Sequence, residues 1–271
     1  MLRLINKLKN RFKSHQALIL KYAASDTVFI YQMGKVGSTT LENSLPNAVH
    51  LHAFYSKNHT CPVRLFGLRK LSLAHAFYTI EQELLWWYIR RVFKRRRQQG
   101  KVTKIITLVR EPLSRNQSMF FHDLDAYLYM AHTNCLNTRV AAIPTRCQTT
   151  RLLSDVFTQE FNHEYAANWF DKEFLPMTGI NIYQYDFDKE RGVSRIQEKG
   201  IDILCLNCEK IQENEKLLSD FVGNTIEVSS TNKAEDKWYG DLYKQFKADY
   251  ALPEGVYKKI YTSRFYQHFF T

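Results

Sequence analysis

Short apolar runs recur along the chain, and each is bounded by polar or turn-forming residues. The first run, TVFIYQM, ends in a glycine-bearing turn, and the second, AVHLHAF, follows a short polar stretch. Apolar runs of this length, rich in β-branched and aromatic residues, are typical of buried strands. We therefore predict five strands, at residues 27–33, 48–54, 104–110, 180–187 and 201–207.

Between these runs the apolar positions recur every three or four residues, which predicts amphipathic helices. Gly100 ends the longest helix, and Pro112 directs the chain into another. The expected helices cover residues 38–45, 71–99, 113 onward, 152–174 and 213–222, with two more in the tail around Pro253 and Gly255. Strands that alternate with helices favour an α/β fold with a mostly parallel, helix-covered sheet. The loops after Met33 and Val109 then share the ligand-binding edge of that sheet.

The chain has 271 residues, enough to bury a substantial core within one α/β domain. We assign residues 26–271 to this domain and residues 1–25 to a basic amphipathic segment. The segment shows neither an apolar run of the ~20 residues that span a bilayer nor a signal-peptide pattern. It either lies on an anionic membrane surface or packs on the domain. We expect a cytoplasmic protein, with peripheral contact at the inner membrane face as one option.

The chain carries a formal net charge of +11 at pH 7. This charge predicts an anionic partner without choosing among a phosphorylated cofactor, an acidic glycan, nucleic acid and anionic lipid. The cluster at residues 90–97 either attracts an acidic glycan or lipid or forms a solvated basic face. Five cysteines are an odd set that is typical of reduced thiols. Cys205 and Cys208 spell CxxC inside an apolar run, which favours core packing over a metal site.

A turn rich in glycine and hydroxyl residues, GKVGSTT, follows the first predicted strand. Its glycines let backbone amides approach an anion, its hydroxyls add donors at a helix start, and Lys35 adds a full charge. These are the parts of a phosphate cradle, although a plain strand-turn-helix junction uses similar residues. The order differs from the GxxxxGK[ST] loop of nucleoside triphosphatases, because Lys35 precedes the second glycine.

A second polar group, REPLSRNQS, follows the third predicted strand. Arg110 ends the strand, and Ser118 follows eight residues later, about two helical turns along the next helix. Both side chains are then able to face one anion near the same edge of the sheet.

Together these motifs resemble the two cofactor motifs of sulfotransferases that use 3′-phosphoadenosine 5′-phosphosulfate (PAPS). Residues 168–192 are similar to a segment of carbohydrate sulfotransferases, and NKAEDKWYGDLYKQFK at 232–247 resembles bacterial capsular polysaccharide synthesis proteins. The resemblance implies a P-loop-like sulfotransferase fold. It also implies transfer of a sulfuryl group from PAPS to a glycan hydroxyl, with 3′,5′-ADP (PAP) as product and no metal.

The resemblance assigns the two ends of the cofactor to the two motifs. The 3′-phosphate would lie against Arg110 and Ser118, with Lys233 and Lys237 of the tail as further candidates. The positions implied for the 5′-phosphosulfate are Lys35, Gly37, Ser38, Thr39 and Thr40. Lys35 and the backbone amides of residues 37–39 would stabilise negative charge during an in-line attack on sulfur.

A general base near the acceptor hydroxyl is the other expected catalytic group. His52 is our candidate, because it ends the second predicted strand at the ligand-binding edge. The competitors are His50, His75, His122 and a carboxylate, since sulfotransferases use histidine in some branches and glutamate in others.

Three other functions remain open. A nucleotide-dependent kinase or phosphotransferase would use the same cradle with an acidic metal ligand, for which Asp123 and Asp125 lie near the second motif. A nucleic-acid-binding protein fits the charge, but no binding motif with aromatic platforms is present, so we expect no nucleic acid partner. A sulfotransferase-like protein without catalysis is the third.

Overall fold

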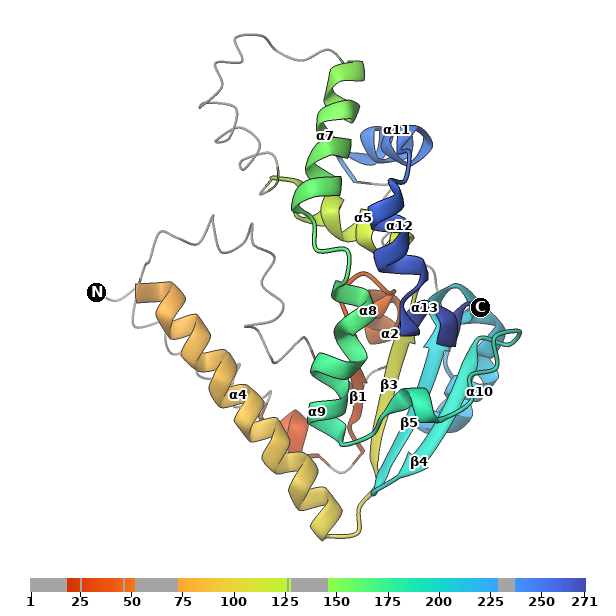
Figure 1. Cartoon of the computed structure of the whole chain (residues 1–271). Helices are drawn as coiled ribbons and strands as arrows, with labels where there is room; N and C mark the ends of the chain where they lie inside the picture. Colours follow the sequence, from red (N-terminus) through yellow and green to blue (C-terminus); the bar gives the residue numbers. More distant parts are fainter. Residues whose placement is uncertain are drawn as a thin grey trace.

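The computed structural model describes residues 19–24, 26–45, 47–51, 73–125, 127, 146–228 and 237–271 (Figure 1). Residues 1–18 lie outside these ranges, so the division into a basic amino-terminal segment and one domain stays a prediction.

One five-stranded sheet, with the strand order β2-β1-β3-β5-β4, forms the centre of this part of the chain. Strands β1, β2, β3 and β5 run parallel, whereas β4 is antiparallel to β5. All residues of β1 and β5 are buried, as expected of central strands covered on both faces. The strands are β1 (Val28–Tyr31), β2 (Ala48–Leu51), β3 (Thr103–Val109), β4 (Val193–Glu198) and β5 (Ile201–Asn207). The predicted α/β class with a mostly parallel sheet is confirmed.

The strand predicted at residues 180–187 is wrong. Ile182–Gln184 form a short 3₁₀ turn, and the Asn181 side chain caps it by accepting a hydrogen bond from the Tyr183 amide at 3.2 Å. Ile180 and Ile182 are buried in the main core, so their apolar character reflects packing rather than strand pairing.

The strand beside β5 is instead β4, which the sequence reading missed. A tight turn at Lys199 and Gly200 joins β4 to β5, and both residues have positive φ, +52° and +73°. Positive φ at both central residues is the geometry of a two-residue hairpin turn. The residues EKGI, directly after the alternating segment VSRIQ, were the available signal.

Gly192 leads into β4 at a position that requires glycine. Its φ is +67°, and a Cβ atom there would lie 2.9 Å from Asn207 Cβ and 2.9 Å from Lys210 Cδ. We expect Gly192→Ala to lower the free energy of unfolding by about 2 kcal/mol, because strain and overlap add.

Gly255→Ala is the matched control, since Gly255 lies in a helix with no atom within 4 Å of the added Cβ. This change should be neutral or stabilising by up to about 1 kcal/mol. Urea unfolding measures both, and similar values for the two variants would contradict the prediction.

Helices lie in the connections between the parallel strands. Most were anticipated, including the end of α4 at Gly100, which has φ +67°. The α-helices include α2 (Ser38–Ser44), α4 (Leu73–Gln98), α5 (Pro112–His122), α7 (Arg146–Glu160), α8 (Tyr165–Trp169), α9 (Leu175–Thr178), α10 (Glu215–Val222), α11 (Gly240–Asp249), α12 (Glu254–Tyr261) and α13 (Arg264–Phe269).

Two helix predictions need correction. The helix predicted over residues 152–174 is interrupted between α7 and α8, and a π-helical turn, Phe170–Phe174, joins α8 to α9. The tail from Gly240 onward forms three helices rather than two, because Ser263 starts α13 by accepting a hydrogen bond from the Tyr266 amide at 3.2 Å.

Two apolar clusters hold these elements together. The larger joins the sheet to α4, α8 and α9, which lie on one face of it in Figure 1, and it includes the fully buried Cys205. Core packing of Cys205 is thus confirmed, and burial raises the pKa of its thiol. The smaller cluster, centred on Phe120, Phe157 and Phe246, joins α5, α7 and α11 beyond the carboxyl ends of the strands. No described helix is both long and apolar enough to cross a membrane.

Candidate functional site

The parallel strands β1 and β3 are neighbours, and their carboxyl ends lie side by side. The strand order of the sheet reverses between these two strands. β1 leads to β2 on one side, and β3 is followed by β5 on the other. In open α/β sheets ligands bind outside such a switch point. The segments that follow the two strands are the lysine turn, residues 34–37, and the start of α5.

Two arginines from the second motif hold the lysine turn. The Arg110 Nη1 atom donates a hydrogen bond to the Lys35 carbonyl oxygen at 3.1 Å. The Arg115 Nε atom donates to the Gly34 carbonyl oxygen at 3.0 Å. The two motifs that were recognised separately in the sequence are therefore in direct contact.

The turn itself has an unusual backbone. Lys35 has φ +69° and Gly37 has φ +89°, so both are left-handed. Gly37 accommodates this conformation without penalty, whereas a lysine held there is strained by about 1 kcal/mol or more. The contacts from Arg110 and Arg115 to the turn carbonyls help to impose that conformation.

Arg115 is a buried cation rather than a ligand-facing one, since only 2% of it is exposed. Its guanidinium lies 4.4 Å from the centre of the Tyr165 ring, and its Nη1 atom donates to Asn116 Oδ1 at 3.1 Å. Burial lowers the pKa of Arg115 to about 10, which still leaves it charged at neutral pH. We infer that it acts as an internal support for the turn.

Positive charge gathers around the Lys35 ammonium. Burial lowers the pKa of Lys35, and the charges of Arg110, Lys237 and Arg115 lower it further. The nearby Asp123 carboxylate acts in the opposite direction. Because cations outnumber this carboxylate, the site favours a ligand with more than one negative charge.

The amino terminus of α5 is capped by the Glu111 carboxylate. Glu111 accepts hydrogen bonds from the amides of Leu113 at 3.0 Å and Ser114 at 2.7 Å, and Tyr261 donates its hydroxyl to Glu111 at 3.0 Å. Those two α5 amides already have a partner in Glu111, which leaves the Arg110 side chain as the candidate anion contact on this segment. Ser118 is buried on α5 and lies one turn beyond Arg115.

The structure describes only some of the other predicted site residues. His52 and Lys233 lie outside the described residues, as do the side chains of Ser38, Thr39, Thr40 and His75. The backbone of residues 38–40 forms the first turn of α2. His50 lies within β2, with its Nδ1 atom 3.9 Å from Glu42, and His122 is exposed at the end of α5.

Sequence reasoning did not anticipate the role of His163. This residue is buried, its Nε2 atom lies 2.8 Å from the Phe157 carbonyl oxygen, and its own carbonyl accepts from Asn116 Nδ2 at 3.1 Å. Asn116 in turn contacts Arg115, so His163 belongs to the support behind the lysine turn. A lone histidine after a helix gave no signal for this position.

His163 predicts a pH dependence of stability. Burial lowers its pKa to about 4, below the value of about 6.5 in an unfolded chain. The unfolded state therefore binds the proton first, and folding stability falls as the pH drops from about 6.5 toward 4. We expect His163→Gln to remove about 2 kcal/mol of the decline between pH 7 and pH 5, measured by urea unfolding at pH 7, 6 and 5. The same pH slope in both proteins would contradict the assignment.

Comparison with known proteins connects part of the chain to a described family. Residues 145–271, which include β4, β5, Lys237 and the helices of the tail, match a family model described as "putative capsular polysaccharide synthesis protein". Searches of curated proteins and of solved structures found no match. The Lys35 turn and Arg110 precede the matched region. The carboxyl-terminal part of the chain, from the start of α7 onward, is thus similar to a family named for capsular polysaccharide synthesis.

Proposed function

We propose that this protein is a sulfotransferase that moves a sulfuryl group from PAPS to a hydroxyl of a glycan. The observation that best supports this proposal is the contact between the two motifs at the switch point. Arg110 donates to the Lys35 carbonyl at 3.1 Å, and the charges of Lys237 and Arg115 lie close by. A donor with phosphate groups at both ends of its ribose matches this excess of cations on two adjacent segments.

The chain's own residues would bind and orient the donor. Lys35 and the amides of residues 37–39 hold the 5′ side, with the hydroxyls of Ser38, Thr39 and Thr40 as further donors. Arg110 and Ser118 hold the 3′-phosphate, and Lys233 and Lys237 approach it from the tail. PAPS supplies an activated sulfuryl group, so the protein's part is alignment and charge stabilisation.

Proton removal from the acceptor is assigned to His52. The acceptor oxygen forms a bond to sulfur, the bond from sulfur to the 5′-phosphate oxygen breaks, PAP leaves, and the acceptor proton passes to His52. His52→Ala should lower turnover by about 10²-fold or more and leave PAP affinity unchanged. His50→Ala is the comparison, because His50 lies two residues earlier, within β2.

The glycan acceptor rests on the family match of residues 145–271. The direct experiment incubates the protein with PAPS and a panel of acidic and neutral polysaccharides, and follows PAP release together with the mass of the polymer fragments. A mass gain of one sulfuryl group per event supports the proposal. Release of PAP without a sulfated product, or no release with any polymer, counts against it.

A phosphotransferase is the second candidate, and the position of Asp123 favours it. This carboxylate lies close enough to Lys35 to affect its pKa, and a metal-dependent nucleotide site needs an acidic ligand there. ATP with Mg²⁺ in the same assay separates the two functions. Phosphate transfer from ATP, with no reaction from PAPS, would establish the second candidate.

A further inference from the structure

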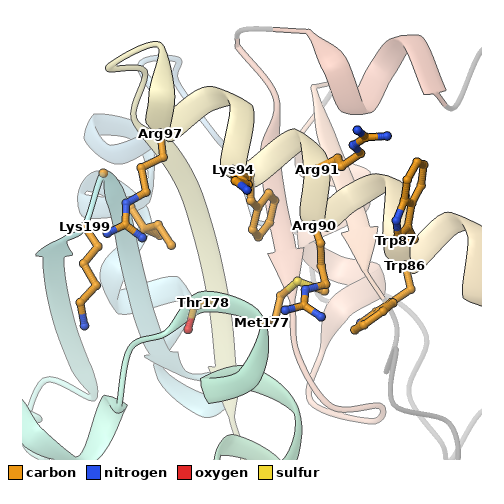
Figure 2. A pocket seen from close by; sticks show the side chains of 12 residues that line it. Trp86, Trp87, Arg90, Arg91, Lys94, Arg97, Met177, Thr178 and Lys199 are labelled. Carbon is orange, nitrogen blue, oxygen red and sulfur yellow. The ribbon is translucent and has the colours of Figure 1, made fainter.

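A second cationic site lies at the opposite edge of the sheet, where α4 ends and β5 begins. A pocket of about 390 Å³ opens there between α4, the end of α9 and the β4–β5 hairpin (Figure 2). In Figure 2, Trp86 and Trp87 lie at one end of the pocket, and Arg97 and Lys199 lie at the other. Met177 and Thr178 face α4 across it.

The pocket is strongly basic. Its lining includes Arg90, Lys94 and Arg97, and none of its described lining residues is acidic. Residues 84–110 contain no aspartate or glutamate at all. Glu198 pairs with Lys199 at 2.8 Å, so Lys199 is partly neutralised, whereas the three α4 cations pair with no carboxylate in the described part of the chain.

Two indole rings hold guanidinium groups in place at this surface. The Arg90 guanidinium lies 4.6 Å from the Trp86 ring centre, and the Arg91 guanidinium lies 4.4 Å from that of Trp87. Such cation–π contacts orient the charge before a ligand arrives. Trp87 is 52% exposed, so an apolar ring surface is available beside the cations.

We propose that this pocket is a binding site for an acidic polysaccharide, separate from the reacting centre and resting on the proposed glycan sulfotransferase function. Sugar rings offer apolar faces for the indoles, and their carboxylates or sulfates pair with Arg90, Lys94 and Arg97. A concave site between three elements suits one segment of a polymer better than the flat surface of a bilayer. β3 has seven residues and spans about 20 Å, so a unit held here is far from Lys35.

The distance gives the pocket a defined role. A long polymer bound at both sites raises the effective concentration of its hydroxyls at the reacting centre. Short oligosaccharides cannot reach both sites, so they gain nothing from the pocket.

Heparin and hyaluronan are the probes, with dextran as the neutral polymer. Arg90→Gln/Arg97→Gln should weaken binding of the acidic polymers about tenfold. The control, Lys216→Gln/Lys244→Gln, removes the same charge from exposed positions on α10 and α11 and should change binding less than twofold. Trp87→Ala should weaken binding about threefold without any change of charge. Thermal unfolding checks that each variant is folded.

The outcomes separate this inference from the proposed function. Equal losses in the two charge pairs, an unchanged Trp87→Ala variant, or equal binding of dextran would overturn the pocket assignment. Retention on phosphatidylglycerol vesicles with no retention of the polymers would instead identify a membrane-docking face and overturn it as well. PAP binding, titrated separately in wild type and in Arg90→Gln/Arg97→Gln, should be the same in both. Its absence from the wild type would count against the proposed function alone.

Discussion

Lys35→Ala should reduce kcat/KM for sulfuryl transfer by at least about 10²-fold. The ammonium is the one charged group among the side chains of the turn, and the Arg110 hydrogen bond goes to the Lys35 backbone. Alanine therefore keeps the contact between the motifs and loses the charge. Because lysine and alanine tolerate a φ of +69° equally poorly, the free energy of unfolding should change by less than about 1 kcal/mol. Steady-state kinetics and urea unfolding measure the two quantities.

The control for this variant is Lys244→Ala, an exposed lysine on α11. It changes the net charge by the same amount and should leave kcat/KM within about twofold. Wild-type turnover in Lys35→Ala would contradict the assignment of the lysine turn to the reacting site.

Arg115→Ala should have the largest effect on stability. The substitution deletes the donor to the Gly34 carbonyl, the contact with Asn116 and the packing against Tyr165. Hydrogen bonds from a charged group contribute about 1.5–3 kcal/mol each, and the buried acceptors lose their partner. We expect the free energy of unfolding to fall by about 3 kcal/mol and PAP affinity to fall with it, because the turn relaxes.

Arg151→Ala, at an exposed position of α7, is the comparison and should cost less than about 0.5 kcal/mol. Arg115→Lys distinguishes charge from geometry, since lysine keeps the charge but loses the planar fork. Stability close to the wild type in Arg115→Ala would show that the turn is held by other contacts.

The parallel part of the fold was predictable because its signals are local. The run TVFIY is a buried strand that ends in a glycine turn, and IITLVREP gives a strand, its end and a helix start in eight residues. β4 was missed because its alternation of apolar and polar residues is weak. The strand forms because the tight Lys199–Gly200 turn brings it beside β5. Residues 180–187 were wrongly predicted as a strand because their apolar pattern is strong. Ile180 and Ile182 are buried in the core, but they do not pair with a strand of the sheet.

The site was predictable only as two separate motifs. The eight-residue spacing of Arg110 and Ser118 predicts that both lie near one edge of the sheet. No sequence spacing predicts that Arg110 donates a hydrogen bond to the Lys35 carbonyl. The support behind the turn consists of Arg115, Asn116 and His163. Asn116 and His163 are 47 positions apart in the sequence, so only tertiary packing brings them together. Likewise, the charge of Lys237 reaches Lys35 from the tail.

Calorimetric titration with 3′,5′-ADP tests the central claim most directly. Wild type should bind it at least tenfold more tightly than 5′-AMP or ATP, because the proposed contact of Arg110 is with the 3′-phosphate, which the other two lack. Arg110→Ala should bind 3′,5′-ADP and 5′-AMP equally weakly, while Lys244→Ala behaves as wild type. Absence of binding, preference for ATP, or full selectivity retained in Arg110→Ala would contradict the assignment of this site to PAPS.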